Sequence, residues 1–194
     1  MKTFRNIMSW IVPILVALAA VFLIRTYLFE MVGVMGDSMQ PNLENKERMM
    51  VIKPLQIKQN SVIVFDAYGE DPTAAKNTNY VKRVIGLPGD KVASHNGTLY
   101  INGKKVSQSY ISEAERTSGT GNWTLSRLAK QRNWKYRGAT VPKGKYFVLG
   151  DHRSVSEDSR YWGYVSAKKV MGVVKIPFWQ STKTYRTNVN SMAN

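Results

Sequence analysis

The sequence contains no cysteine, which excludes disulfide bonds, thiol nucleophiles and metal sites with cysteine ligands. Any domain that the chain forms must therefore be stable without covalent cross-links. Histidine occurs only twice, at His95 and His152, which is too few for a convincing zinc site. We therefore expect no metal, and we identify no cofactor.

Acidic residues are also scarce, since 13 Asp and Glu face 28 Lys and Arg and give a net charge of +15. A surplus of this size implies attraction to something anionic, such as nucleic acid, lipid headgroups or an acidic cell wall. The chain carries no zinc finger and no aromatic-basic signature, so we expect no nucleic-acid partner and favour a membrane or a wall. A solvated basic surface is the simpler alternative.

Only one long apolar run occurs in the 194 residues, which suit one domain plus an appendage. Residues 7–24 are uncharged and almost wholly apolar, which is long enough for a helix to cross a bilayer. We assign residues 7–29 to a single-pass membrane anchor and residues 1–6, with Lys2 and Arg5, to the cytoplasm, so the rest of the chain lies on the extracytoplasmic face. A cleaved signal peptide is the alternative, because residues 17–20 are small, but the apolar run continues past them.

Residues 30–179 show short β-branched runs separated by turn residues, which predicts a mainly β domain. Two Asn-Gly pairs, at 96–97 and 102–103, predict β-hairpins because both residues tolerate positive φ. The runs that predict strands are 49–52, 61–65, 80–85, 146–149 and 170–176. We interpret the basic segment at about 107–140 as a peripheral, solvated insertion with one short helix at 125–131, and residues 180–194 as a loose polar tail.

Ser38 lies in the turn-like stretch Gly36-Asp37-Ser38-Met39-Gln40-Pro41, directly after the anchor and the first short strand. A serine in such a turn usually serves only the backbone, and it becomes a nucleophile only beside a base and an oxyanion donor. Lys82 has the best setting of the lysines, because on a strand it projects with Tyr80 and Val84. Burial there would lower the lysine pKa toward neutrality, whereas a strand-edge lysine that reaches water would keep its charge.

A third polar segment, Gly150 to Arg160, is dense in hydroxyls, carboxylates and arginines. Side chains packed at this density can hold a lysine amine in one orientation. Together with the serine and lysine stretches, it forms an ordered set of three motifs behind an anchor.

These three motifs resemble those of the type I signal peptidase family. The missing disulfide framework and the small catalytic domain suggest a member of the Gram-positive type. Residues 38–43 are similar to the Ser-Met-x-Pro-Thr-Leu motif, residues 80–90 match the lysine motif, and residues 150–160 resemble Gly-Asp-Asn-Arg-x-x-Ser-x-Asp-Ser-Arg. The chain departs from the family at Asn42, where threonine is usual, and at His152, where asparagine is usual.

The resemblance implies an antiparallel β-sheet catalytic domain of the signal-peptidase type and a membrane-bound serine endopeptidase. Such an enzyme would remove signal peptides from exported preproteins, cut after small residues, and act as a monomer at the bilayer. Ser38 would be the nucleophile and Lys82 the general base. The resemblance further implies that Ser156 hydrogen-bonds Lys82, and that two ion pairs brace the site, Asp151 with Arg83 and Asp158 with Arg160.

The resemblance also assigns the oxyanion and substrate contacts. The backbone N–H of Ser38 would meet the oxyanion, and many members add a hydroxyl two residues earlier, where this chain has Gly36. An extended signal peptide would lie beside the strand before Ser38, in shallow pockets. The residues that match the family's pocket walls are Val34, Met39, Leu43, Tyr80 and Val81.

Two other functions fit parts of the sequence. A self-cleaving regulator with a Ser/Lys site would share the chemistry, but the membrane segment and the missing DNA-binding helices argue against it. An anchored, non-enzymatic module that binds an acidic wall or lipid would explain the charge of +15 but not the three motifs.

Overall fold

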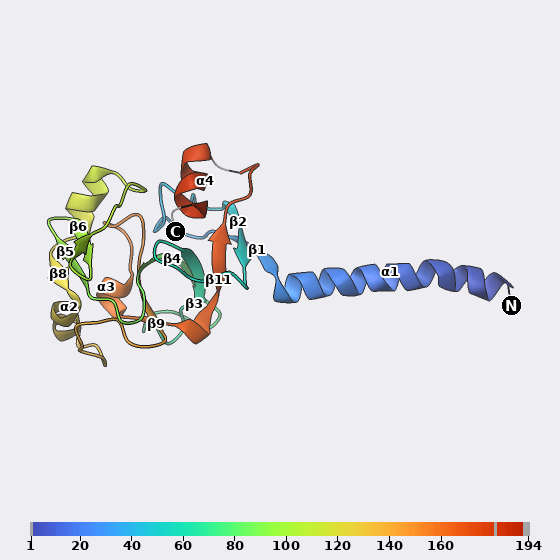
Figure 1. Cartoon of the computed structure of the whole chain (residues 1–194), viewed down its shortest axis with the longest axis horizontal. Helices are drawn as coiled ribbons and strands as arrows, with labels where there is room; N and C mark the ends of the chain where they lie inside the picture. Colours follow the sequence, from blue (N-terminus) through green and yellow to red (C-terminus); the bar gives the residue numbers. More distant parts are fainter. Residues whose placement is uncertain (1, 181, 192–194) are drawn as a thin grey trace.

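Two antiparallel sheets form the body of the molecule in the computed structural model, which describes residues 2–180 and 182–191. A long helix projects from this body beside β1, and the smaller sheet lies at the opposite side (Figure 1). The fold is therefore mainly β with one N-terminal apolar helix, as the sequence predicts. The larger sheet has the order β1 (Phe29–Gly33), β2 (Arg48–Ile52), β11 (Val170–Lys175), β3 (Val62–Asp66), β4 (Asn79–Gly86), β9 (Lys145–Leu149) and β10 (Val165–Ser166).

The smaller sheet is built from the predicted hairpins. Asn96 and Gly97, and again Asn102 and Gly103, all have positive φ, so each pair reverses the chain between neighbouring strands. The sheet has the order β7 (Lys104–Lys105), β6 (Thr98–Ile101), β5 (Val92–His95) and β8 (Trp123–Thr124).

The N-terminal helix α1 (Lys2–Tyr27) contains the apolar stretch, and its segment Ser9–Tyr27 is long and apolar enough to cross a membrane. None of this segment is buried against the protein. Strand β1 begins at Phe29, so the helix ends two residues before the boundary expected from the sequence. From Phe29 onward the backbone pairs with β2 in an antiparallel ladder instead of continuing the helix.

Alternation of side chains along β3 gives the large sheet two apolar faces. Val62 and Val64 pack into one core cluster, and Ile63 and Phe65 pack into another. Both faces are covered, which explains why this strand reads as an unbroken apolar run.

The basic segment at 107–140 is not a peripheral insertion, contrary to the sequence-based expectation. Its helix α2 (Leu125–Gln131) has the predicted bounds, but Leu125 and Leu128 are buried together with Trp134 in a core cluster that includes Phe147 of β9. The sequence did not predict this burial, because the segment has many basic residues and few apolar ones between them. The segment also holds η1 (Glu115–Gly119), one wide helical turn.

The tail is not loose at residues 183–190, where helix α4 (Lys183–Asn190) packs against β11 (Figure 1). Thr182 caps its first turn, and Val189 is buried in the same core cluster as Val62 and Val64. One apolar side chain in a polar helix was too weak a signal to predict this packing. The remaining short helices are α3 (Ser159–Trp162) and η2 (Ala167–Lys169).

Candidate active site

Ser38 and Lys82 are brought together from positions 44 residues apart. Lys82 Nζ lies 2.7 Å from Ser38 Oγ and is hydrogen-bonded to it. Ser38 sits in the turn after β1 and is partly exposed, whereas Lys82 lies in the middle of β4 with only 4% of its surface exposed. The serine is thus open to a substrate and the lysine is shielded from water.

The strand placement of Lys82 explains its burial. Its direct partner across the ladder is Ile63 of β3, and its ammonium lies 5.4 Å from the centre of the Tyr80 ring. Burial lowers the pKa of Lys82 from 10.5 to about 8, against the opposing attraction of the Asp158 carboxylate. With this pKa about a tenth of the Lys82 side chain is the neutral amine at pH 7, which is the form that can accept a proton.

A hollow of about 410 Å³ opens beside the two reactive groups. One wall is the chain from Val32 to Met39, and the facing wall is the start of β4 with Tyr80 and Val81. Val34 and Met39 also line it, as the sequence predicted. Leu43 does not: it is fully buried in the core under Met39, so its expected contact with substrate is wrong.

The hollow has further walls that the sequence did not reveal. Val155 and Glu157 reach it from the loop after β9, Asn77 reaches it from the segment before β4, and Asn79 is the first residue of β4. Met35, which is 93% exposed, stands at its rim. Nothing in the local pattern of these residues distinguishes them from ordinary loop positions.

The ion pair between Arg83 and Asp151 is formed as expected and is completely buried. Arg83 donates to both carboxylate oxygens of Asp151, at 2.8 and 2.6 Å. Burial disfavours the charged guanidinium, but the Asp151 carboxylate outweighs it and raises the pKa of Arg83. This pair joins β4, which carries Lys82, to the polar loop that follows β9.

The second expected pair, Asp158 with Arg160, folds that loop onto itself. Arg160 Nε donates to Asp158 Oδ1 at 2.8 Å, and Asp158 Oδ2 accepts from the backbone N–H of Gly150 at 3.0 Å. The backbone N–H of His152 donates to the carbonyl oxygen of Ser38 at 3.1 Å, so the loop is hydrogen-bonded directly to Ser38. The loop therefore fixes the position of the serine turn.

Ser156 departs from expectation. Its hydroxyl is buried, and within the described residues it forms no hydrogen bond, so the predicted bond to Lys82 is absent. The side chain lies against Gly150 instead, where a β-carbon would collide with both the Ser156 side chain and the Ser38 carbonyl oxygen. Lys82 is oriented here by Ser38 and by its apolar surroundings.

The oxyanion donors follow the sequence only in part. In the described part of the chain the backbone N–H of Ser38 has no hydrogen-bond acceptor, so it is free to meet a developing oxyanion. Gly36 has a φ of +88°, and a β-carbon there would meet nothing within 4 Å. The hydroxyl that many family members carry two residues before the serine is thus absent here, although there is room for a side chain at Gly36. The positive φ at Gly36 is a conformation that favours glycine.

A buried polar network behind the site was missed by the sequence reading. Asn42 donates to Asp151 Oδ2 at 2.8 Å and to the Tyr110 carbonyl at 2.7 Å, and it accepts from Asn188 of α4 at 2.7 Å. Arg83 also donates to the Asn188 carbonyl oxygen at 3.0 Å. The unusual Asn42 thus has a role, since its amide links the serine turn to three other segments.

Neither histidine is placed to act as the base. His95 ends β5 and makes an edge-to-face contact with Tyr100, and His152 Nδ1 lies 3.2 Å from the Asp37 carbonyl oxygen. Among residues 2–180 and 182–191, no group of three His, Asp or Glu side chains could hold a metal ion. The side chains that meet at the centre of this candidate site are Ser38 and Lys82.

Comparisons with known proteins identify the family to which the chain is similar. A family described as "Signal peptidase, peptidase S26" matches residues 7–179. Signal peptidase IB of Staphylococcus aureus (strain COL) is 36% identical over 194 residues, covering 96% of each chain, and signal peptidase I P of Bacillus subtilis subsp. natto is 39% identical over 179 residues, covering 90% of each. A crystal structure of a signal peptidase I from Enterococcus faecalis V583 is 36% identical, with a TM-score of 0.51 over 61% of this chain and 97% of that one.

Proposed function

Since the chain belongs to the signal peptidase family, peptidase S26, we propose that it is a membrane-bound endopeptidase that removes signal peptides with a Ser38/Lys82 dyad. The family is one of serine protease hydrolases, which supports the general activity. The distance of 2.7 Å between Ser38 Oγ and a buried Lys82 Nζ is the observation that carries the assignment of the dyad.

The reaction would begin with Lys82 as the neutral amine. The Ser38 hydroxyl donates its hydrogen bond to this amine, and Lys82 takes the proton as Oγ bonds to the carbonyl carbon of the scissile peptide. The same proton then passes to the departing amine, which leaves an acyl group on Ser38. Lys82, neutral again, activates the water that releases the signal peptide.

The oxyanion of the tetrahedral intermediate would be met by the N–H of Ser38. A donor of this kind typically contributes about 2.7–4 kcal/mol to the stability of the transition state. The open space at Gly36 would admit a water molecule in place of the hydroxyl that other members carry.

The signal peptide would lie extended in the 410 Å³ hollow, with its backbone beside Val32 to Met35. Val34, Met39 and Tyr80 line the hollow there, and they would form the shallow pockets for alanine-sized residues that the proposed cleavage requires. Helix α1 would cross the bilayer with its first residues in the cytoplasm, since Lys2 and Arg5 favour that side.

Cleavage of a purified preprotein tests this proposal. Ser38→Ala and Lys82→Ala should each lose at least about a thousandfold in kcat/KM, because either change removes an essential partner of the reaction. Lys145→Ala is the matched control, since its ammonium is exposed and only loosely paired, with Glu70 at 3.8 Å. Full activity in either dyad variant would overturn the assignment.

A further inference from the structure

A second hollow of about 560 Å³ lies between η1 and the hairpin of β6 and β7. It shares no lining residue with the hollow beside Ser38. Hydroxyl and amide groups make up much of its wall, including those of Asn96, Thr98, Ser107 and Ser109. The proteolytic mechanism uses none of these residues.

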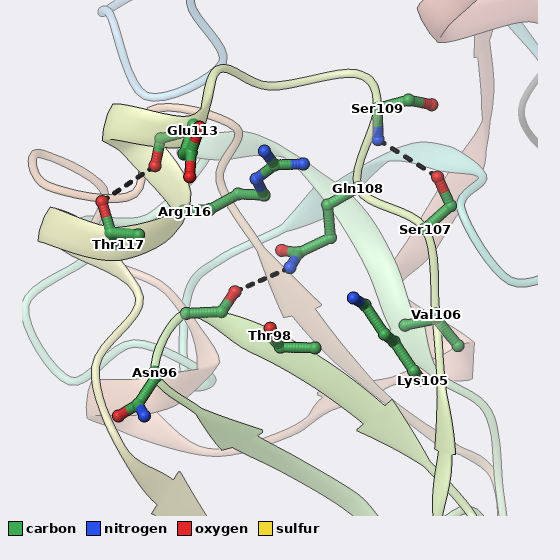
Figure 2. Close-up of a pocket in the computed structure, with 11 residues that line it drawn as sticks. Asn96, Thr98, Lys105, Val106, Ser107, Gln108, Ser109, Glu113, Arg116 and Thr117 are labelled. Carbon is green, nitrogen blue, oxygen red and sulfur yellow. Dashed lines mark hydrogen bonds between the residues drawn. The ribbon is translucent and has the colours of Figure 1, made fainter.

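Two cationic side chains converge in this hollow. Figure 2 shows Arg116 reaching in from η1 and Lys105 from β7, both toward the amide of Gln108. Neither cation forms an ion pair with any residue in the described part of the chain, although Glu113 lies in the same wall. Arg116 is partly buried and Lys105 is exposed. A partly buried arginine without an acidic partner loses some of its hydration, and an anion in the hollow would offset that cost.

The chemistry of the wall selects the kind of anion. A guanidinium offers a planar fork of donors and an ammonium offers a compact charge, and together they suit the several oxygens of a phosphate. The hollow is much larger than one phosphate, and its remaining hydroxyls and amides suit a hydroxylated body. We propose that this hollow binds a phosphate group carried on a polyol or a sugar, through Arg116 and Lys105.

The segment that carries Arg116 also contacts the polar loop after β9, on the side away from the hollow. Glu115, next to Arg116, accepts from the backbone N–H of Ser154 at 3.3 Å, and the Gly119 carbonyl oxygen accepts from Arg160. Gln108, at the base of the hollow, accepts from Arg153 at 2.6 Å.

Arg153 completes this connection, because it is buried and donates to the Gly150 carbonyl oxygen at 2.8 Å. A ligand that fixes Arg116 and Gln108 therefore steadies the loop that holds the Ser38 turn. Because the backbone N–H of His152 in this loop donates to the Ser38 carbonyl oxygen, a ligand that steadies the loop also changes how firmly Ser38 is held, and we expect the rate of cleavage to change with it.

Isothermal titration of the full chain in detergent with sn-glycerol 3-phosphate tests the site. Saturable binding is expected, at least tenfold weaker in Arg116→Ala and in Lys105→Ala. It should be unchanged in Lys104→Ala, an exposed lysine of the same strand that does not line the hollow, and in Ser38→Ala, which separates this site from catalysis. Equal weakening in Lys104→Ala, or no binding, would overturn the proposal.

Three further arms sharpen the result. Glycerol should not bind, and binding as strong as that of its phosphate would refute a phosphate site. Inorganic phosphate and short-chain phosphatidylglycerol, each titrated into the full chain in detergent, identify the source of the phosphate. Saturable binding of the lipid that is lost in Arg116→Ala would assign the phosphate to a lipid headgroup. Arg116→Lys keeps the charge and should retain part of the binding, which distinguishes a lost contact from a misfolded variant.

The connection to catalysis has its own readout. Saturating glycerol phosphate should change the rate of preprotein cleavage by the wild type at least twofold and leave the rate of Arg116→Ala unchanged. An unchanged wild-type rate at saturation would refute the coupling.

Discussion

Replacing Lys82 by methionine should make the protein more stable at neutral pH while it abolishes cleavage. Burial lowers the Lys82 pKa from 10.5 to about 8, so the folded state disfavours the charged form that water favours. Each pKa unit corresponds to about 1.4 kcal/mol, which puts this cost at about 3 kcal/mol at pH 7. The variant also loses the hydrogen bond to Ser38, worth about 1 kcal/mol, so a net gain of about 2 kcal/mol is expected.

The pH dependence of this gain tests its cause. Between pH 8 and 10.5 the unfolded state binds more protons at Lys82 than the folded state does, so the contribution of Lys82 to stability rises with pH in this window. The advantage of Lys82→Met should therefore shrink by about 2 kcal/mol between pH 7 and pH 9.5.

Denaturant unfolding of the full chain in detergent, followed by tryptophan fluorescence at the two pH values, measures both quantities. Lys104→Met serves as the control, because that lysine is exposed and should show no pH-dependent difference. A Lys82→Met variant less stable than the wild type at pH 7, or a gap that stays constant with pH, would refute burial as the cause of the low pKa.

Three further predictions follow from the site. The kcat/KM for preprotein cleavage should rise about tenfold per pH unit below pH 8 and level off above it, and initial rates that stay flat from pH 6 to 8 would contradict a lysine base. Arg83→Met should cost about 3–5 kcal/mol in denaturant unfolding, because Asp151 is left buried without its cation, and stability equal to the wild type would show that the pair is dispensable. Gly150→Ala should lower kcat at least tenfold with little change in KM, since a β-carbon collides with Ser156 and with the Ser38 carbonyl oxygen; steady-state kinetics with an unchanged kcat would show that the loop can yield.

The sequence predicted those parts of the fold that depend on neighbouring residues. The Asn-Gly hairpins, the strands through Val64 and Val84, and helix 125–131 all have local signals, either turn residues or a side-chain period. Ser38 and Lys82 could also be identified from the sequence, because each lies in a motif that resembles one of the family's. The 2.7 Å between them depends on how β4 and the turn after β1 meet, which no local pattern records.

The unpredicted parts depend on residues that are distant in sequence. Asn42 and Asn188 meet across 146 positions, and the burial of Arg153 depends on Gln108 and Tyr110, which lie in a segment that looked solvated. Ser156 shows the opposite case, because its motif predicted a bond to Lys82 that the packing against Gly150 replaces. Polar pairings of this kind need the whole fold before either partner can be identified.

The contacts of helix α4 imply that the site is completed late in the synthesis of the chain. A ribosome makes Asn188 146 residues after Asn42, long after it has made Ser38 and Lys82. Until residues 183–190 have emerged and docked, Asn42 and the Arg83 guanidinium lack partners that they have in the finished fold. A growing chain therefore contains Ser38 and Lys82 before the hydrogen bonds behind them are complete. We expect full cleavage activity only after α4 has docked.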